Sequence, residues 1–242
     1  MSLAWHPTCS NILGVTVSSG GVYTVDISVS EAAAQGTGKE ILIHDLEAWT
    51  LSFSHTGKGV YSGGDDATLR YSTLPDMTSS TSAAQDEEED EDFFSSQWQD
   101  RRAHDAGVTA ILPLAHEQNI LITGSYDDNI RVLFCPQIGR KQVLAEENLE
   151  GGVWRLKLLT SSPQDSKYMV LASCMHAGTR IVSVTKDEGG DWSIEVLARF
   201  EEHKSMNYGS DVQPGCQSGG EQTIISTSFY DKLLCLWRFT LA

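Results

Sequence analysis

The sequence lacks the features that mark membrane-spanning and exported proteins. No run of eighteen consecutive apolar residues occurs within its 242 residues, so a membrane-spanning helix is not expected. The N-terminal residues MSLAWHP lack the basic and apolar regions of a signal peptide. We therefore expect a soluble protein of the cytoplasm that does not associate with membranes.

Paired cysteines and basic residues are also scarce. The five cysteines are scattered with no C-x-x-C pair, which suits a reducing compartment. No cluster of metal ligands is visible, so we expect neither a metal nor another cofactor. Lys and Arg number 17 against 33 Asp and Glu, and the net charge of −16 argues against nucleic-acid binding. Seven of these acids are consecutive, at 86–92.

The chain also lacks a long helical period, and short β-rich segments separated by turn residues recur instead. Three of these segments follow one pattern: DATLRY from Asp66, DDNIRV from Asp127 and DKLLCL from Asp231. Each follows a strand end rich in small residues. A histidine precedes each aspartate by 22, 23 and 28 residues; the three are His44, His104 and His203. A repeated unit this short must stack on copies of itself to bury its apolar face.

The repeats predict an all-β protein of the WD-repeat β-propeller class, with about five recognisable four-stranded blades in a single domain over 1–242. Predicted strands lie at 2–5, 12–17, 22–29 and 40–43; 49–53, 59–63 and 68–72; 108–112, 120–124, 130–134 and 142–145; 153–158, 169–174, 179–184 and 192–199; and 208–212, 223–228 and 233–239. Because no strand remains to close the fifth unit, we expect an N-terminally truncated seven-bladed ring. The alternative is an open arc closed by a partner or a second copy.

Residues 76–100 interrupt the repeats. A Ser/Thr/Ala-rich stretch and the acidic run predict a disordered insert. Phe93, Phe94 and Trp98 follow the acids, and they either pack as a late fourth strand of the second blade or serve as a docking motif.

The recurring Asp and His residues have a structural explanation. In WD-repeat propellers, the aspartate of the turn between the second and third strands shares one hydrogen-bonded network with the histidine ahead of the first strand. The fourth unit departs from this rule, because the alignment places His176 where the others have Asp. Gly151 and Gly152 stand where the others have His. Such departures are common at functional sites, although His176 could also simply cap its own turn.

Several strings are more specific than the repeat itself: HDLEAW at 44–49, YSGGDD at 61–66, GGVWRLK at 151–157, ASCMHAG at 172–178, YGSD at 208–211 and SFYDKLLCLW at 228–237. In this order they resemble the C-terminal two-thirds of the diphthine methyl ester hydrolase family, the WD-repeat proteins of diphthamide biosynthesis. The resemblance implies a cytoplasmic hydrolase, a methylesterase that acts on elongation factor 2 carrying methylated diphthine and leaves diphthine.

The residues permit that chemistry. No G-x-S-x-G motif is present, which disfavours a serine triad. We expect His176 to be the general base or nucleophile. Arg155 and the amides of Gly151 and Gly152 would steady the oxyanion or the substrate carboxylate.

Three further residues complete the expected site. Asp211 and Tyr208 would orient the base or the substrate's trimethylammonium group, and Trp154 would contribute to substrate binding. Each of these has an ordinary structural alternative as a strand or core residue, and Cys174 is expected to be a buried thiol. A different function, a non-catalytic scaffold that binds elongation factor 2 or another protein, is common among propellers.

Overall fold

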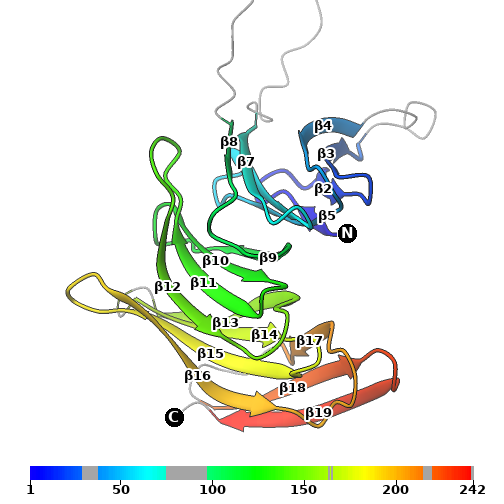
Figure 1. Cartoon of the computed structure of the whole chain (residues 1–242), viewed down its shortest axis with the longest axis vertical. Coiled ribbons are helices and arrows are strands. Elements are labelled where there is room, and N and C mark those ends of the chain that lie inside the picture. Colours follow the sequence, from blue (N-terminus) through cyan, green and yellow to red (C-terminus); the bar gives the residue numbers. More distant parts are fainter. Residues whose placement is uncertain (29–37, 75–96, 163, 165, 215–219, 241–242) are drawn as a thin grey trace, which may run out of the picture. The chain divides into compact units, whose positions relative to one another are not determined.

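The computed structural model describes residues 1–28, 38–74, 97–162, 164, 166–214 and 220–240 (Figure 1). The described residues form 19 strands and no α-helix, and accordingly none of them belongs to a helix that could cross a membrane. The chain divides into two compact units, Met1–Arg101 and Arg102–Ala242.

The first unit contains two four-stranded antiparallel sheets, in the orders β1-β2-β3-β4 and β5-β6-β7-β8. Their strands are β1 (Leu3–Trp5), β2 (Ile12–Thr16), β3 (Gly21–Asp26), β4 (Gly38–Ile43), β5 (Ala48–Phe53), β6 (Gly59–Gly64), β7 (Leu69–Thr73) and β8 (Gln97–Asp100). Each sheet therefore has the meander connection of a propeller blade.

The second unit contains two four-stranded sheets and one three-stranded sheet, again connected as meanders. Their strands are β9 (Val108–Pro113), β10 (Ile120–Ser125), β11 (Asn129–Phe134), β12 (Gln142–Asn148), β13 (Arg155–Ser162), β14 (Lys167–Ser173), β15 (Thr179–Lys186), β16 (Trp192–Phe200), β17 (Gly209–Val212), β18 (Glu221–Ser228) and β19 (Leu233–Thr240). The five predicted blades are confirmed, each as one sheet. The truncated ring stays a prediction.

The end of the predicted insert packs as part of the second blade. Gln97–Asp100 forms β8, and the Trp98 ring stacks on Tyr71 with centroids 5.6 Å apart and an interplanar angle of 18°. The packing alternative is thus confirmed for Trp98. Phe93, Phe94 and the rest of the insert lie outside the described residues.

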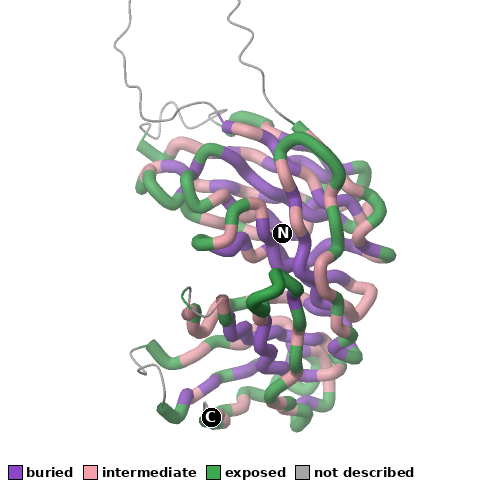
Figure 2. Tube along the Cα trace, turned by 90° about the vertical axis from the view of Figure 1, so that its left-hand side faces the viewer, coloured by how far each residue is buried: buried purple, intermediate pink, exposed green. Residues whose placement is uncertain are grey.

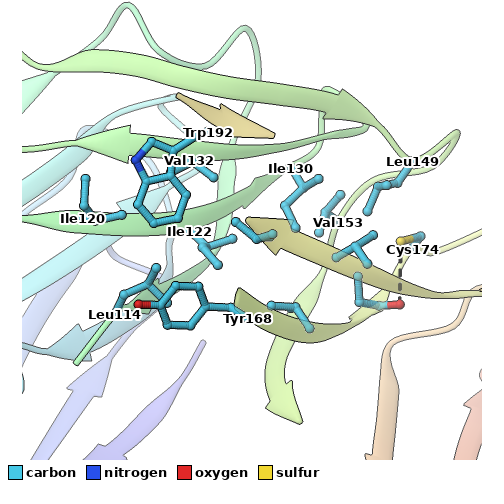
Figure 3. Packing of buried hydrophobic residues seen from close by; sticks show 14 residues of the cluster. Leu114, Ile120, Ile122, Ile130, Val132, Leu149, Val153, Tyr168, Cys174 and Trp192 are labelled. Carbon is cyan, nitrogen blue, oxygen red and sulfur yellow. Dashed lines mark hydrogen bonds between the residues drawn. The ribbon is translucent and has the colours of Figure 1, made fainter. Parts of the chain in front are cut away.

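Neighbouring blades of the second unit bury their facing sides. β10 is buried along its whole length, whereas the outer strand β16 begins with the buried Trp192 and then alternates between exposed and half-buried residues. Figure 2 shows the buried and exposed stretches along the chain. Figure 3 shows the core between the β9–β12 and β13–β16 sheets, where Ile122, Ile130 and Val132 meet Tyr168 and Cys174. A second cluster joins the β13–β16 sheet to Ile224 of β18. This packing determines the positions of the strand termini and of the turns that connect them.

Candidate functional site

In three blades the recurring aspartates hold the turn between the second and third strands. Asp66, Asp127 and Asp231 each accept a hydrogen bond from the backbone N–H that follows the paired histidine, at 3.1, 2.9 and 3.0 Å. Asp66 is also joined to Nδ1 of His44 at 2.9 Å. The carboxylates therefore bind the turn to the preceding loop.

The histidines of the same blades are buried and complete the network. Nε2 of His44, His104 and His203 lies 2.9, 2.9 and 2.8 Å from the hydroxyl oxygens of Ser62, Thr123 and Ser226, respectively. The structural role predicted for these Asp and His residues is confirmed, and none of them is a candidate for catalysis.

The fourth blade lacks this network altogether. Cα pairs Gly63–Leu69, Gly124–Ile130 and Ser173–Thr179 each enclose a five-residue turn. His176 is the third residue of its turn, as Asp66 and Asp127 are of theirs. By the same register, Ala172 stands where the other blades have the Ser or Thr hydroxyl. All three members of the network are therefore replaced.

The arginine that accompanies the network remains, but it has new partners. Arg131 pairs with Asp127 at 2.8 Å. Its counterpart Arg180, whose side chain is 1% exposed, pairs instead with Glu150 at 3.1 Å and Glu201 at 2.8 Å. Carboxylates from the neighbouring loops thus neutralise the buried guanidinium of Arg180. The residue at position 176 is therefore not needed as its ion-pair partner.

His176 is exposed on the turn between β14 and β15. Its turn has positive φ at Met175 (44°) and Gly178 (79°), whereas the Asp66 and Asp127 turns have it at the residue after the aspartate. Met175 is bridged to Asn207, whose N–H donates to the Met175 carbonyl at 2.9 Å. Within the described part of the chain, the His176 imidazole forms no hydrogen bond or ion pair, so it is available to a ligand.

The two glycines lie directly beneath this turn. A Cβ on Gly151 would lie 2.4 Å from the carbonyl oxygen of Cys174, and one on Gly152 would lie 2.6 Å from Sδ of Met175. The backbone therefore approaches the His176 turn more closely than a side chain would allow. Neither glycine N–H donates a hydrogen bond to any residue that the structure describes. Both amides thus lack an acceptor among the described residues.

Arg155 begins β13 and is half-buried. Its Nη1 donates to the carbonyl oxygens of Trp154 at 2.8 Å and Thr109 at 3.3 Å, and its guanidinium carbon lies 5.0 Å from the Trp154 ring centroid. Burial lowers its pKa. No carboxylate among the described residues pairs with it, so Arg155 is a partly desolvated cation that can attract an anion.

Trp154 and Tyr208 belong to a row of aromatic rings. The Trp154 centroid lies 5.5 Å from that of Tyr126 and 5.2 Å from that of Tyr208, and Phe229 follows 5.9 Å from Tyr208. The aromatic row, defined as Tyr126, Trp154, Tyr208 and Phe229, draws on three blades. Trp154 and Tyr208, the two aromatic residues predicted to bind substrate, therefore lie together, and Arg155 lies over the Trp154 ring.

The partners of Asp211 are residues other than His176. Its carboxylate pairs with Nζ of Lys157 and accepts a hydrogen bond from the Val212 N–H at 2.7 Å; the Lys157 hydrogen bond lowers its pKa. Within the described residues no hydrogen bond joins it to His176. The structure thus brings Gly151, Gly152 and Arg155 near the His176 turn, and the orienting role of Asp211 stays a prediction.

The cysteines and the possible metal ligands of the described residues offer no further reactive group at this place. The Cys174 thiol is buried, and its desolvation raises its pKa to about 12, so it is not a nucleophile at neutral pH. No group of three or more potential metal ligands occurs among the described residues. Cys9, Cys135 and Cys235 form no disulfide among the described residues, to which Cys216 does not belong.

Sequence reasoning missed Tyr126, Phe229 and Asn207. Tyr126 and Tyr230 each precede the turn aspartate of their blade, so superposing the repeats would have revealed an aromatic position next to Asp127 and Asp231. Asn207 is fully buried between the Met175 turn and β17, which only the packing of neighbouring blades shows.

Comparisons with known proteins agree with this fold. The family model described as WD domain, G-beta repeat matches residues 96–132. A chain in the crystal structure of the mitotic checkpoint complex superposes with a TM-score of 0.66 at 15% sequence identity, over 99% of this chain and 61% of that one. At this identity the likeness concerns the fold alone.

Curated relatives share a name. "Diphthine methyltransferase" of Schizosaccharomyces pombe is 33% identical over 93% of this chain and 60% of its own length. "Diphthine methyltransferase homolog" of Dictyostelium discoideum is 27% identical over 98% and 62%. The Homo sapiens protein named "Diphthine methyltransferase" is 32% identical over 69% of this chain and 32% of its own length. The chain thus spans less than two-thirds of the length of these relatives. It is a WD-repeat propeller protein, homologous to the proteins named diphthine methyltransferase.

Proposed function

We propose that this chain hydrolyses the methyl ester of diphthine methyl ester on elongation factor 2, yielding diphthine and methanol in diphthamide biosynthesis. The names of the relatives support the pathway and a reaction of a methyl group. The observation that favours hydrolysis is the fourth blade, where the structural network is replaced. The His176 imidazole has no hydrogen-bond partner among the described residues, and Gly151 and Gly152 pack against its turn. Arg155, whose guanidinium has no carboxylate partner among them, pairs in register with Ser173 just before that turn.

The proposed reaction uses these groups in sequence. The His176 imidazole takes a proton from a water molecule, and the resulting hydroxide attacks the ester carbonyl carbon. The glycine amides and Arg155 stabilise the oxyanion of the tetrahedral intermediate. The bond to the methoxy oxygen then breaks, the imidazolium returns its proton to that oxygen, and methanol and the carboxyl group leave.

The first experiment distinguishes hydrolysis from methyl transfer to another acceptor. Purified chain is incubated with elongation factor 2 carrying diphthine methyl ester in water labelled with heavy oxygen. Acyl hydrolysis releases unlabelled methanol and leaves one labelled oxygen in the carboxyl group, detected by peptide mass spectrometry. Loss of the ester without methanol would indicate transfer to a different acceptor.

A non-catalytic scaffold gives a third outcome. In that case the chain binds elongation factor 2 but the ester persists at the rate seen without protein. Retention of the ester alongside measurable binding would contradict the proposed function.

A further inference from the structure

Two aromatic side chains in the turn between β18 and β19 are unusually exposed. Phe229 is 64% and Tyr230 71% exposed, although large aromatic residues are normally mostly buried. Phe229 meets Tyr208 at an interplanar angle of 68° and Tyr230 at 89°. Phe229 therefore stands edge to face against both of its aromatic neighbours.

An open hollow of about 300 Å³ lies against two of these rings. Its lining consists of Met206, Tyr208, Thr227, Ser228, Phe229, Lys232, Leu233 and Leu234. The lining is mostly apolar, with two aromatic rings and a polarizable thioether among its walls. The aromatic row ends in this hollow, because Tyr208 and Phe229 belong to both.

A hollow with aromatic walls is suited to a quaternary ammonium group. Such a cation has no N–H to donate, so it needs no hydrogen-bond acceptor, and it is attracted by the negative faces of aromatic rings. The same row already holds a cation elsewhere, since the Arg155 guanidinium lies over Trp154. The net charge of −16 also favours a cationic ligand over an anionic one.

Lys232 adds a second requirement. Lys232 lines the hollow and has no ion-pair partner among the described residues, so its positive charge would repel a simple cation bound there. A ligand that carries a carboxyl or ester carbonyl beside its quaternary ammonium group can interact with both: the ammonium group with the rings, and the carbonyl oxygen with the lysine. The hollow thus matches a head group with the charge pattern of a betaine.

We propose that the hollow lined by Tyr208, Phe229 and Lys232 binds a quaternary ammonium group flanked by a carboxyl function. The identification of this ligand with the trimethylammonium end of the substrate rests on the proposed function. The binding itself does not. Phe229 and Lys232 would then determine specificity for the trimethylated substrate.

The probe is glycine betaine, titrated into the whole chain by NMR or calorimetry. The matched comparison is 3,3-dimethylbutanoate, in which a neutral carbon replaces the cationic nitrogen at the same size. We expect betaine to bind saturably and about tenfold more tightly than this isostere. Equal affinity for the two compounds, or absence of saturable binding by betaine, would overturn the proposal.

Variants locate the site. Phe229→Leu keeps an apolar side chain but removes the aromatic ring, so betaine affinity should fall about fivefold or more. The control is Leu236→Ala, because Leu236 on β19 is similarly exposed but lies outside the hollow; its betaine affinity should be unchanged. Lys232→Ala should weaken betaine but not tetramethylammonium. An unchanged betaine affinity in Phe229→Leu, with near-ultraviolet circular dichroism confirming its fold, would contradict the proposal. Betaine binding without ester hydrolysis would remove the proposed function and leave this site standing.

Discussion

At the level of single residues, three arginines of the second unit differ in whether a carboxylate neutralises their charge, and this difference separates structural arginines from a candidate binding residue. Arg131 pairs with Asp127 and Glu146, and Arg180 with Glu150 and Glu201. These guanidiniums are neutralised and structural. Arg155 contacts two carbonyl oxygens and a ring and pairs with no carboxylate of the described residues, so it retains its capacity to attract an anion.

Asp127 provides a test of the structural network. Its side chain and that of Arg131 are 7% and 3% exposed, so Asp127→Asn leaves a buried cation short of a partner. We expect a loss of about 3 kcal/mol in the free energy of unfolding, measured by urea denaturation. Asp231→Asn, at an exposed position, should cost clearly less. Equal losses would contradict the burial argument.

The same carboxylates predict acid sensitivity. Burial tends to raise the pKa of Asp127, but hydrogen bonds from Arg131 and two backbone N–H groups lower it overall; the pKa of Asp66 is likewise lowered. Their stabilisation is fully present above the ordinary carboxyl pKa of about 4 and is lost as pH falls through the lower native values. Urea midpoints should therefore fall below about pH 4, and less so in Asp127→Asn.

Cysteine reactivity tests the assignment of Cys174 as a core residue. Because its thiol is buried and its pKa is raised to about 12, iodoacetamide at neutral pH should leave it unmodified in the folded protein. The half-buried Cys9 and Cys235 should react first, as peptide mapping would show. Rapid modification of Cys174 would mean that the fourth blade opens readily.

At the scale of elements, the β14–β15 turn differs from its counterparts in backbone as well as in sequence. The sequence alone predicted that His176 replaces an aspartate, because strand register in a repeat protein follows from aligned turns. It did not predict the positive φ angles at Met175 and Gly178 or the close approach of Gly151 to the turn, which only the structure shows.

Gly151→Ala tests this contact. The new Cβ would lie 2.4 Å from a backbone oxygen, so the turn must shift, and we expect a loss of about 1–3 kcal/mol in the free energy of unfolding. Ester hydrolysis should fall as well, because His176 moves with the turn. Gly38→Ala, whose Cβ would make an ordinary 3.7 Å contact, is the control and should change neither property.

The fourth strand of the second blade is tested at Trp98. Trp98→Ala removes the stack on Tyr71 and should cost about 2 kcal/mol by denaturant unfolding. Gln99→Ala, exposed on the same strand β8, should be nearly neutral. If both variants unfold alike, β8 does not contribute to the blade.

At the scale of the whole molecule, the sequence predicted the five sheets well and the site only in part. Alternating apolar residues and turn signals mark strands locally, so the strand positions followed from the chain itself. The aromatic row could not be predicted in this way. Tyr126, Trp154, Tyr208 and Phe229 come from three blades, and their meeting depends on how those blades pack in the second unit.

In the proposed function the blade without the structural network carries the chemistry, and the His176→Ala variant removes its proposed base. The measurement is the single-turnover rate of methyl ester loss from elongation factor 2, followed by mass spectrometry. His116→Ala, which removes another exposed imidazole of the same unit, is the control. The account predicts a fall of about a hundredfold or more in His176→Ala, with unchanged stability and full activity in the control. A rate for His176→Ala equal to that of the parent chain would contradict it.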